Sequence, residues 1–178
     1  MRNTINPQII HEAIQITKDL GNVVFIGATA LLLHDINNRT TRDIDFVILI
    51  DNEYEKNEFV LERNYITTLE NGKPVTRTPS PRRFKVDVYN EPIGNISVKE
   101  IFDKAVEKIH KKGTVKVASI ETLIVLKHRA GRTQDIEDIS SITKKYYHKI
   151  DYTKLSSICQ NDTEMNEIKN ALIFHYKS

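Results

Sequence analysis

Three aspartates have the residue type and spacing for metal-assisted chemistry. Asp43 and Asp45 are two residues apart at the start of a β-prone apolar run, Ile44 to Ile50. Because side chains alternate along a strand, both carboxylates are expected on one side, about 6 to 7 Å apart at the backbone. Asp87 lies in a second β-prone segment, residues 84–89, where apolar and polar residues alternate. If these segments are neighbouring strands, the three carboxylates share one edge of a sheet.

Such a group of acids is typical of a divalent-cation site. Neighbouring carboxylates repel one another and raise each other's pKa unless a cation lies between them. Mg²⁺ prefers oxygen ligands and keeps waters, which leaves coordination positions for substrate phosphates. The six histidines and the single cysteine show no zinc-binding spacing. The sequence therefore favours phosphoryl chemistry with Mg²⁺, or Mn²⁺ in its place, over zinc-dependent hydrolysis.

A purely structural interpretation of these acids remains open. Asp43 and Asp45 could be solvated residues of a strand-start turn, paired with Arg39 or Arg42. Asp87 could be an exposed acid on the polar face of an edge strand. A metal-dependent nuclease would also use three such carboxylates.

The elements that must position these residues follow from apolar periodicity. A helix is predicted from Asn6-Pro7 to Leu20 and ends at Gly21. The β-prone run 23–26 ends at Gly27 and turns directly into a short helix over residues 28–33. The run Ile44 to Ile50 is almost continuously β-branched or aromatic, which indicates a strand buried on both faces at the centre of a sheet.

The rest of the chain changes from strand to helix character. A helix near residues 53–63, a hairpin turn at Asn71-Gly72 and the strand 84–89 are predicted first. Ser119 then caps a helix to about Ala130, and a helix over 133–145 and two shorter ones follow. The order indicates an α+β (α/β two-layer) fold with a mixed sheet flanked by helices and a small C-terminal helical part. We expect a core over residues 1–112, with residues 113–178 as helices packed on the same domain.

The composition is that of a globular protein, and the net charge does not indicate any class of binding partner. The chain has 178 residues, 39% of them hydrophobic, and 26 basic against 24 acidic side chains give a net charge of +2. The single Cys159 cannot form an internal disulfide, so a reducing cytoplasm is expected. Residues 1–8 lack the apolar stretch of a secretory signal, and no run approaches the roughly 18 apolar residues of a membrane span. We therefore expect a cytoplasmic protein without a membrane partner.

Two segments resemble the polymerase-beta-like nucleotidyltransferase superfamily, and within it the minimal and abortive-infection-toxin-like branches. They are residues 26–31 (IGATAL) and 39–46 (RTTRDIDF), which match an apolar strand, a glycine turn, a helix and the pattern Arg-x-Thr-x-Asp-x-Asp. Residues 85–88 (KVDV) supply the later aspartate of the family. The helical stretch from Ala118 to Asp138 is also similar, so the resemblance covers roughly residues 20 to 140.

The resemblance implies a role for each matching position. Asp43 and Asp45 bind the metal, and Asp87 is a third metal ligand and the candidate base for the attacking hydroxyl. The residues implied in holding the nucleoside triphosphate are Gly27, Thr29, Arg39, Thr41 and Lys127. In this family the glycine turn and the helix start favour the anionic phosphates through backbone N–H groups.

Basic residues outside the motif have two interpretations each. Lys127 lies on an apolar helical stripe, where the resemblance implies a phosphate contact, but it could instead snorkel to the surface or pair with a nearby acid. The cluster Arg77, Arg82, Arg83 and Lys85 contacts nucleic acid or solvates a hairpin.

The implied activity is the Mg²⁺-dependent transfer of a nucleoside monophosphate to a hydroxyl of an RNA end, a protein or a small molecule, in a toxin–antitoxin or defence setting. One departure supports an alternative. Ala28 stands where many members carry a second glycine or a serine. The alternative is a catalytically inactive copy of the fold that binds a toxin or antitoxin partner.

Overall fold

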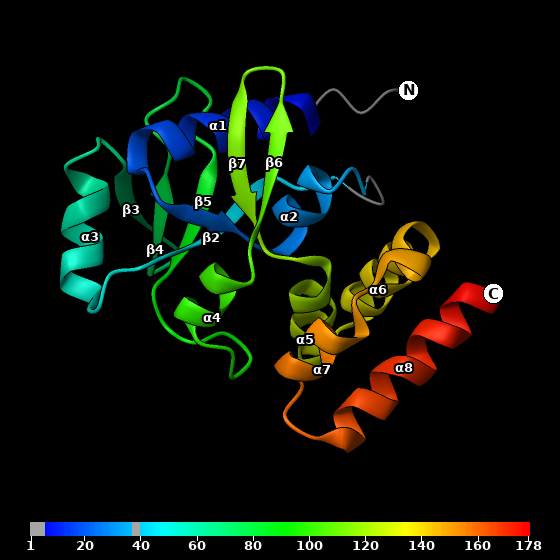
Figure 1. The fold of residues 1–178 in the computed structure, drawn as a ribbon. Helices are drawn as coiled ribbons and strands as arrows, with labels where there is room; N and C mark the ends of the chain where they lie inside the picture. The colour runs from blue at the N-terminus through cyan, green and yellow to red at the C-terminus, as the bar shows by residue number, and fades with distance from the viewer. Residues whose placement is uncertain (1–5, 37–39) are drawn as a thin grey trace. The chain divides into compact units, whose positions relative to one another are not determined.

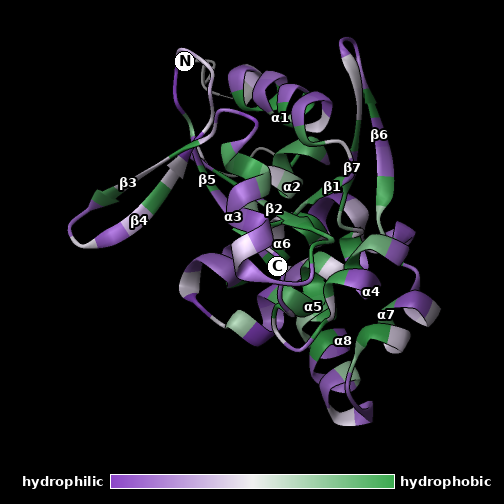
Figure 2. Ribbon diagram, turned by 90° about the vertical axis from the view of Figure 1, so that its left-hand side faces the viewer, coloured by the Kyte–Doolittle hydropathy of each residue, from purple (hydrophilic) through white to green (hydrophobic). Residues whose placement is uncertain are grey.

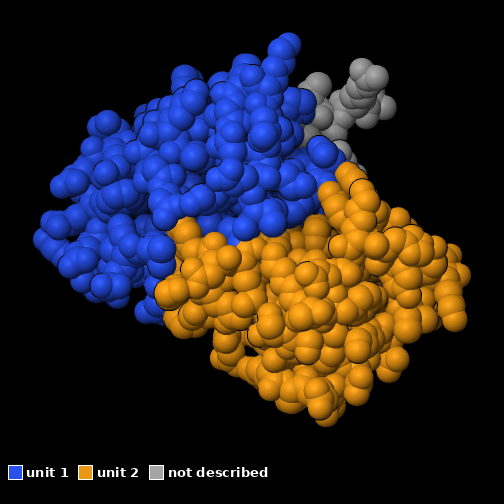
Figure 3. Space-filling view, in the orientation of Figure 1, with its two compact units in different colours: residues 1–91, 105–117 blue, residues 92–104, 118–178 orange. Residues whose placement is uncertain are grey.

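A computed structural model describes residues 6–36 and 40–178 (Figure 1). Arg39, which the motif places among the phosphate contacts, lies outside the described residues. The chain divides into two compact units, coloured separately in Figure 3. Residues 1–91 and 105–117 make the sheet unit, and residues 92–104 and 118–178 make the helical unit.

The sheet unit is built on one mixed sheet with the strand order β3-β4-β5-β2-β1-β7-β6. Its strands are β1 (Val23–Phe25), β2 (Asp43–Ile48), β3 (Ile66–Glu70), β4 (Lys73–Arg77), β5 (Lys85–Tyr89), β6 (Val106–His110) and β7 (Gly113–Val117). The pairs β2·β5 and β1·β7 are parallel, and the other neighbours are antiparallel. The predicted mixed sheet is therefore confirmed.

The strand predicted to be central is central. β2 has three strands on each side, and Ile44 and Phe46 are fully buried. It ends at Ile48, two residues before the predicted end, and Leu49 is 52% exposed. Figure 2 shows the hydrophobic residues concentrated on the central strands.

Three helices complete the sheet unit. α1 (Asn6–Leu20) ends where predicted, because Gly21 takes a left-handed conformation with φ +79°. α2 (Gly27–Leu33) follows β1 directly, and both helices contact central strands. α3 (Glu53–Leu61) is shorter than predicted, and the Asn52 side chain caps its start by accepting from the Glu55 N–H at 2.9 Å.

Two hairpins lie at the two ends of the strand order. The predicted turn Asn71-Gly72 joins β3 and β4 with positive φ at both residues, as a tight hairpin requires. The second hairpin joins β6 and β7, and the predicted boundary at residue 112 falls inside it. Because Gly113–Val117 pairs with both β6 and β1, it belongs to the sheet unit rather than to the helices.

The helical unit holds the helices of the C-terminal part and one short helix from before β6. They are α4 (Val98–Asp103), α5 (Ile120–Ala130), α6 (Thr133–Tyr146), the 3₁₀ turn η1 (Tyr147–Lys149), α7 (Tyr152–Ile158) and α8 (Asp162–Lys177). The predicted cap at Ser119 is present, with its hydroxyl accepting from the Thr122 N–H at 3.3 Å. α4 was not predicted, and α8 is longer than expected, with 16 residues.

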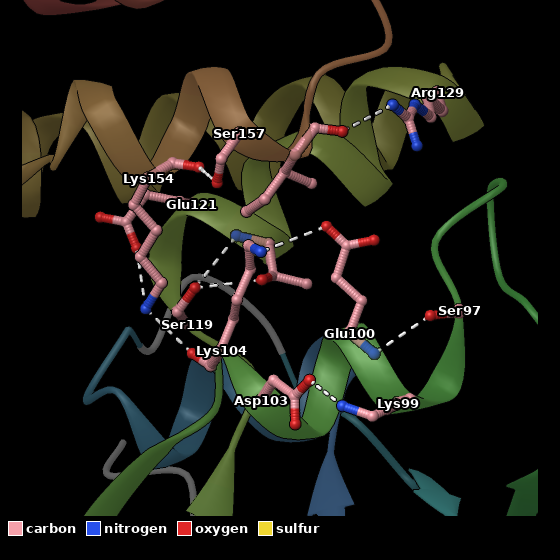
Figure 4. Close-up of polar contacts among 12 residues, drawn as sticks. Ser97, Lys99, Glu100, Asp103, Lys104, Ser119, Glu121, Arg129, Lys154 and Ser157 are labelled. Carbon is pink, nitrogen blue, oxygen red and sulfur yellow. Dashed lines mark hydrogen bonds and ion pairs between the residues drawn. The ribbon is translucent and has the colours of Figure 1, made fainter.

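Long side chains connect the elements of the helical unit (Figure 4). Lys154 of α7 donates to the Lys104 carbonyl at 2.9 Å and lies 3.8 Å from Glu121 of α5. Arg129 forms a two-pronged ion pair with Glu164 of α8, at 2.7 and 2.8 Å. None of the helices in the described parts of the chain has the length and apolar character needed to cross a bilayer.

Candidate functional site

The strand register brings the three aspartates to one face of the sheet. In the parallel pair β2·β5, Asp45 lies opposite Asp87 and Asp43 lies opposite Lys85. Residues two apart in a strand share a face, and so do cross-strand partners. The predicted pairing of the two strands is confirmed, and a lysine that the motif does not include joins the three acids.

Lys85 lies between two of the carboxylates. Its ammonium nitrogen is 3.4 Å from Asp87 Oδ2 and 3.7 Å from Asp43 Oδ2. Partial burial disfavours the charged form, but the charges of Asp87 and Asp43, the hydrogen bond to Asp87 and the charge of Asp45 outweigh it. The pKa of Lys85 is therefore raised, and the lysine acts as an internal counter-charge for the acids.

Gly27 places bare backbone against Asp45. The Ile26 N–H donates to the Asp45 carbonyl at 3.0 Å, which joins the end of β1 to β2. Gly27 follows with φ +61°, and a Cβ on it would lie 2.5 Å from Asp45 Oδ2. A side chain does not fit at this separation, so the turn requires glycine both for its conformation and for its closeness to the carboxylate.

The two threonines of the motif fix the backbone of Asp43. The hydroxyls of Thr29 and Thr41 donate to the Asp43 carbonyl, at 3.2 and 3.0 Å. Thr29 is fully buried and Thr41 is 8% exposed. Sequence reasoning missed this role, because the Thr29 bond depends on a contact between α2 and the start of β2, and the local Thr41 bond depends on how the chain enters β2. Their predicted contact with phosphate stays a prediction.

Lys127 belongs to a buried ion-pair cluster of the helical unit. Its ammonium lies 2.5 Å from Asp138 Oδ2 and 3.5 Å from Asp135 Oδ1, and all three side chains are at most 6% exposed. Asp135 is also paired with Arg132 at 2.7 Å. The structure therefore gives Lys127 the pairing that was one of its two interpretations, and its contact with phosphate stays a prediction.

An open groove of about 490 Å³ begins at Asp43 and is rich in arginine. It is lined by Gln8, Arg42, Asp43, Arg77, Arg82, Arg83, Phe84 and Lys85. We call it the basic groove. The sequence indicated the cluster at residues 77–85, but it gave no sign that Arg42 and Asp43 line the same groove.

The donor set fits the divalent ion that the fold implies. Asp43, Asp45 and Asp87 offer only oxygen atoms on one face, which is the chemistry Mg²⁺ selects. Within residues 6–36 and 40–178, no three His, Cys, Asp or Glu side chains are already arranged as a metal-binding group. The Asp43 and Asp87 side chains are 50% and 38% exposed, so they have room to turn toward a cation.

Comparison with known proteins agrees with this geometry. The chain has the fold of two solved structures, a nucleotidyltransferase-like antigenic protein from Paracoccidioides brasiliensis and a putative nucleotidyltransferase from H. pylori. The first has a TM-score of 0.53 at 16% identity over 96% of this chain and 94% of that one. The second has a TM-score of 0.55 at 13% identity over 99% and 96%.

These likenesses confirm the predicted α+β nucleotidyltransferase-like fold. No curated protein matches the sequence. The family model described as "Nucleotidyltransferase of unknown function (DUF6036)" matches residues 7–177, so the chain belongs to this nucleotidyltransferase family.

Proposed function

We propose that the protein is a Mg²⁺-dependent nucleotidyltransferase that moves a nucleoside monophosphate from a triphosphate to an acceptor hydroxyl. In this reaction the acceptor oxygen bonds to the α-phosphorus, the bond to the β-phosphate oxygen breaks, pyrophosphate leaves, and the hydroxyl proton is taken up by a carboxylate. The observation that carries the proposal is the register of β2 and β5, which gathers three acids beside the Gly27 turn.

Each group would have a definite task. Asp43, Asp45 and Asp87 would hold the divalent ion, which when bound neutralises phosphate charge and lowers the pKa of the acceptor hydroxyl. Asp87 would accept the hydroxyl proton. Gly27 would let the triphosphate approach the backbone closely; α2 has only seven residues, so this role rests on close approach and not on a helix dipole.

The remaining donor-binding residues act in two ways under this proposal. Thr29 and Thr41 would set the position of the Asp43 backbone, and hence of its carboxylate, through their shared hydrogen bonds. Arg39 and Lys127 would neutralise the triphosphate, as the family motif implies.

The contacts of Lys85 favour one alternative. A lysine between Asp43 and Asp87 does the work of a cation inside the protein, which is what an inactive copy of the fold would need. Such a protein would keep the acids for structure and bind a protein partner, as one component of a toxin–antitoxin pair. The two functions differ in whether nucleotide and Mg²⁺ bind.

Calorimetric titration with Mg²⁺ and each of the four nucleoside triphosphates tests the proposal. The wild-type protein should bind at least one triphosphate in the micromolar range, and only with Mg²⁺ present. Asp43→Asn combined with Asp45→Asn should abolish this binding, because the ligands of the ion are lost. Pyrophosphate release in the presence of an acceptor would then establish transfer.

Asp51→Asn is the matched control. Asp51 is an exposed acid three residues beyond the end of β2, so the Asp51→Asn variant makes the same chemical change at one position outside the site. It should bind like the wild type. If none of the four triphosphates binds to a protein that circular dichroism shows to be folded, the transferase proposal is rejected in favour of the inactive, partner-binding protein.

A further inference from the structure

The basic groove carries more positive charge than the protein needs for its own ion pairs. Arg77 is paired with Glu70 at 2.8 Å, and Lys85 is paired with the site acids. Arg42, Arg82 and Arg83 line the same groove, are exposed, and have no ion pair with any residue among those described. Three guanidinium groups are thus available to an anion beside Asp43.

The loop that carries two of these arginines is held in one conformation. The Thr78 N–H donates to the Phe84 carbonyl at 2.9 Å, and the Phe84 N–H donates to the Thr78 hydroxyl at 3.2 Å. Thr78 is fully buried. The Arg83 N–H donates to the Ser80 carbonyl at 2.9 Å while Arg83 has φ +47°, a conformation uncommon for a long side chain. The chain therefore accepts backbone strain at the point where it presents Arg82 and Arg83.

The position of the groove separates it from the glycine turn. Gly27 lies at the end of β1, on one side of β2, whereas Lys85 and Arg77 lie on β5 and β4, on the other side. Asp43 and Asp45 on β2 lie between the two regions, and Asp87 lies beside Asp45 on β5. A triphosphate over the Gly27 turn and an acceptor from the basic groove would therefore reach Asp43 and Asp45 from different sides of β2, an arrangement compatible with in-line displacement.

We propose, on the basis of the proposed function, that the basic groove binds the phosphodiester backbone of a single-stranded nucleic acid whose terminal hydroxyl is the acceptor. Guanidinium groups pair with phosphates in a two-pronged geometry, and the partly exposed Phe84 offers a surface on which a base can stack. A protein partner would need an apolar interface core, and among the described residues that line the groove Phe84 is the only large apolar one.

Fluorescence anisotropy with labelled RNA and DNA single strands of one sequence, in EDTA and without nucleotide, tests this binding directly. The double variant Arg82→Gln with Arg83→Asn removes both loop charges, and asparagine tolerates the left-handed conformation at position 83. Each phosphate contact contributes about 0.7 to the slope of log K against log salt. The double variant should therefore bind about 25-fold more weakly near 0.1 M salt and lose about 1.4 from the slope.

Two further variants control for charge and for local misfolding. Lys111→Gln with Lys112→Asn removes two exposed cations from the β6–β7 turn, at the other end of the strand order, and should bind like the wild type. Arg42→Gln acts from a different element and should weaken binding about fivefold. The proposal would be overturned if the double lysine variant and the double arginine variant lost the same amount of strand affinity. It would also be overturned if the wild type bound neither RNA nor DNA. Arginine-dependent binding of polyglutamate as tight as that of the nucleic acids would overturn it as well, since it would point to an acidic protein acceptor.

The same set of proteins separates this proposal from the proposed function. The Asp43→Asn, Asp45→Asn protein should bind the strand in EDTA at least as tightly as the wild type, because the groove cations are intact and the Asp43 carboxylate that lines the groove no longer repels phosphates; it should lose nucleotide transfer. If the wild type binds the strand but releases no pyrophosphate, the transferase activity is rejected, while strand binding by the basic groove is retained. If the wild type transfers a nucleotide to a small hydroxyl acceptor but binds no strand, only the proposed strand binding by the basic groove is rejected. A preference for RNA over DNA would identify the natural strand.

Discussion

At the scale of single residues, Gly27 is constrained both by its backbone conformation and by its closeness to Asp45. Its backbone is left-handed, and any Cβ would overlap Asp45 Oδ2. Gly21 is also left-handed, with φ +79°, but a Cβ on Gly21 meets nothing within 4 Å. The two glycines therefore differ in surroundings and share a backbone requirement.

Gly27→Ala should disable the site, and Gly21→Ala should not. Both variants carry the cost of a left-handed alanine, about 1 to 2 kcal/mol. Only the first displaces the Asp45 carboxylate, and a shift of about 1 Å in a reacting group costs about a hundredfold in rate. Nucleotide titration and pyrophosphate release measure the difference. Equal activity of the two variants would show that the closeness of Gly27 to Asp45 has no functional role.

Residue type and spacing predicted the acids and the glycine, but not how they are supported. Nothing in the sequence around Asp43 indicates that the Thr29 and Thr41 hydroxyls meet at its carbonyl. The insertion of Lys85 between Asp43 and Asp87 was equally invisible, because it follows from the register of two strands about forty residues apart in the chain.

At the scale of elements, the sequence predicted the helix ends that are set by capping residues next to the helix. α1 ends at a left-handed glycine and α5 begins at a capping serine, and both signals lie within the chain next to the helix. α4 was missed because six residues are too few for a helical period to show. No individual strand was predicted for β6 or β7, because the apolar residues of β6, Val106 and Ile109, are three apart and so do not show the alternation of a one-faced strand.

The pairing of α5 with α6 through Lys127 should be a stability determinant. Lys127→Met leaves Asp138 and Asp135 buried without their shared cation, and loss of one partner of a buried pair costs about 3 to 5 kcal/mol. Urea unfolding followed by circular dichroism measures this loss, with the exposed Lys144→Met as a control that should change little.

The same variant also tests the phosphate contact predicted for Lys127. If Lys127 only stabilises the helices, the folded Lys127→Met protein binds Mg²⁺ and nucleotide like the wild type. Weaker nucleotide binding at a temperature where the variant is fully folded would establish the contact that the family motif implies.

At the scale of the whole molecule, the helical unit depends on ionised carboxylates. Burial opposes ionisation of Asp135, but the hydrogen bond from Arg132 and the charges of Lys127 and Arg132 outweigh it and lower its pKa. The hydrogen bond from Arg129 lowers the pKa of Glu164, against a smaller opposing effect of burial. Both acids belong to the helical unit.

The stability of the helical unit should therefore fall with acidification. A depressed carboxylate pKa contributes stability in full above the unfolded-state pKa, about 4, and the contribution is lost as the pH drops through the lower folded-state pKa. Urea midpoints followed by circular dichroism should decrease from about pH 5 to about pH 3. Glu164→Gln should lower the midpoint near pH 6 and flatten this decrease; an unchanged slope would exclude Glu164 as a contributor.

The sequence by itself determined which groups take part and which local elements carry them. Alternating carboxylates, a glycine after a strand and helix caps are local signals, because each depends on residues close together in the chain. The tertiary structure decided which strands are neighbours, and so placed Asp87 beside Asp45 and Lys85 between the acids. It also gave Lys127 buried acidic partners and joined Arg42 to the arginines of the β4–β5 loop. These outcomes depend on contacts between distant segments, which local pattern does not encode.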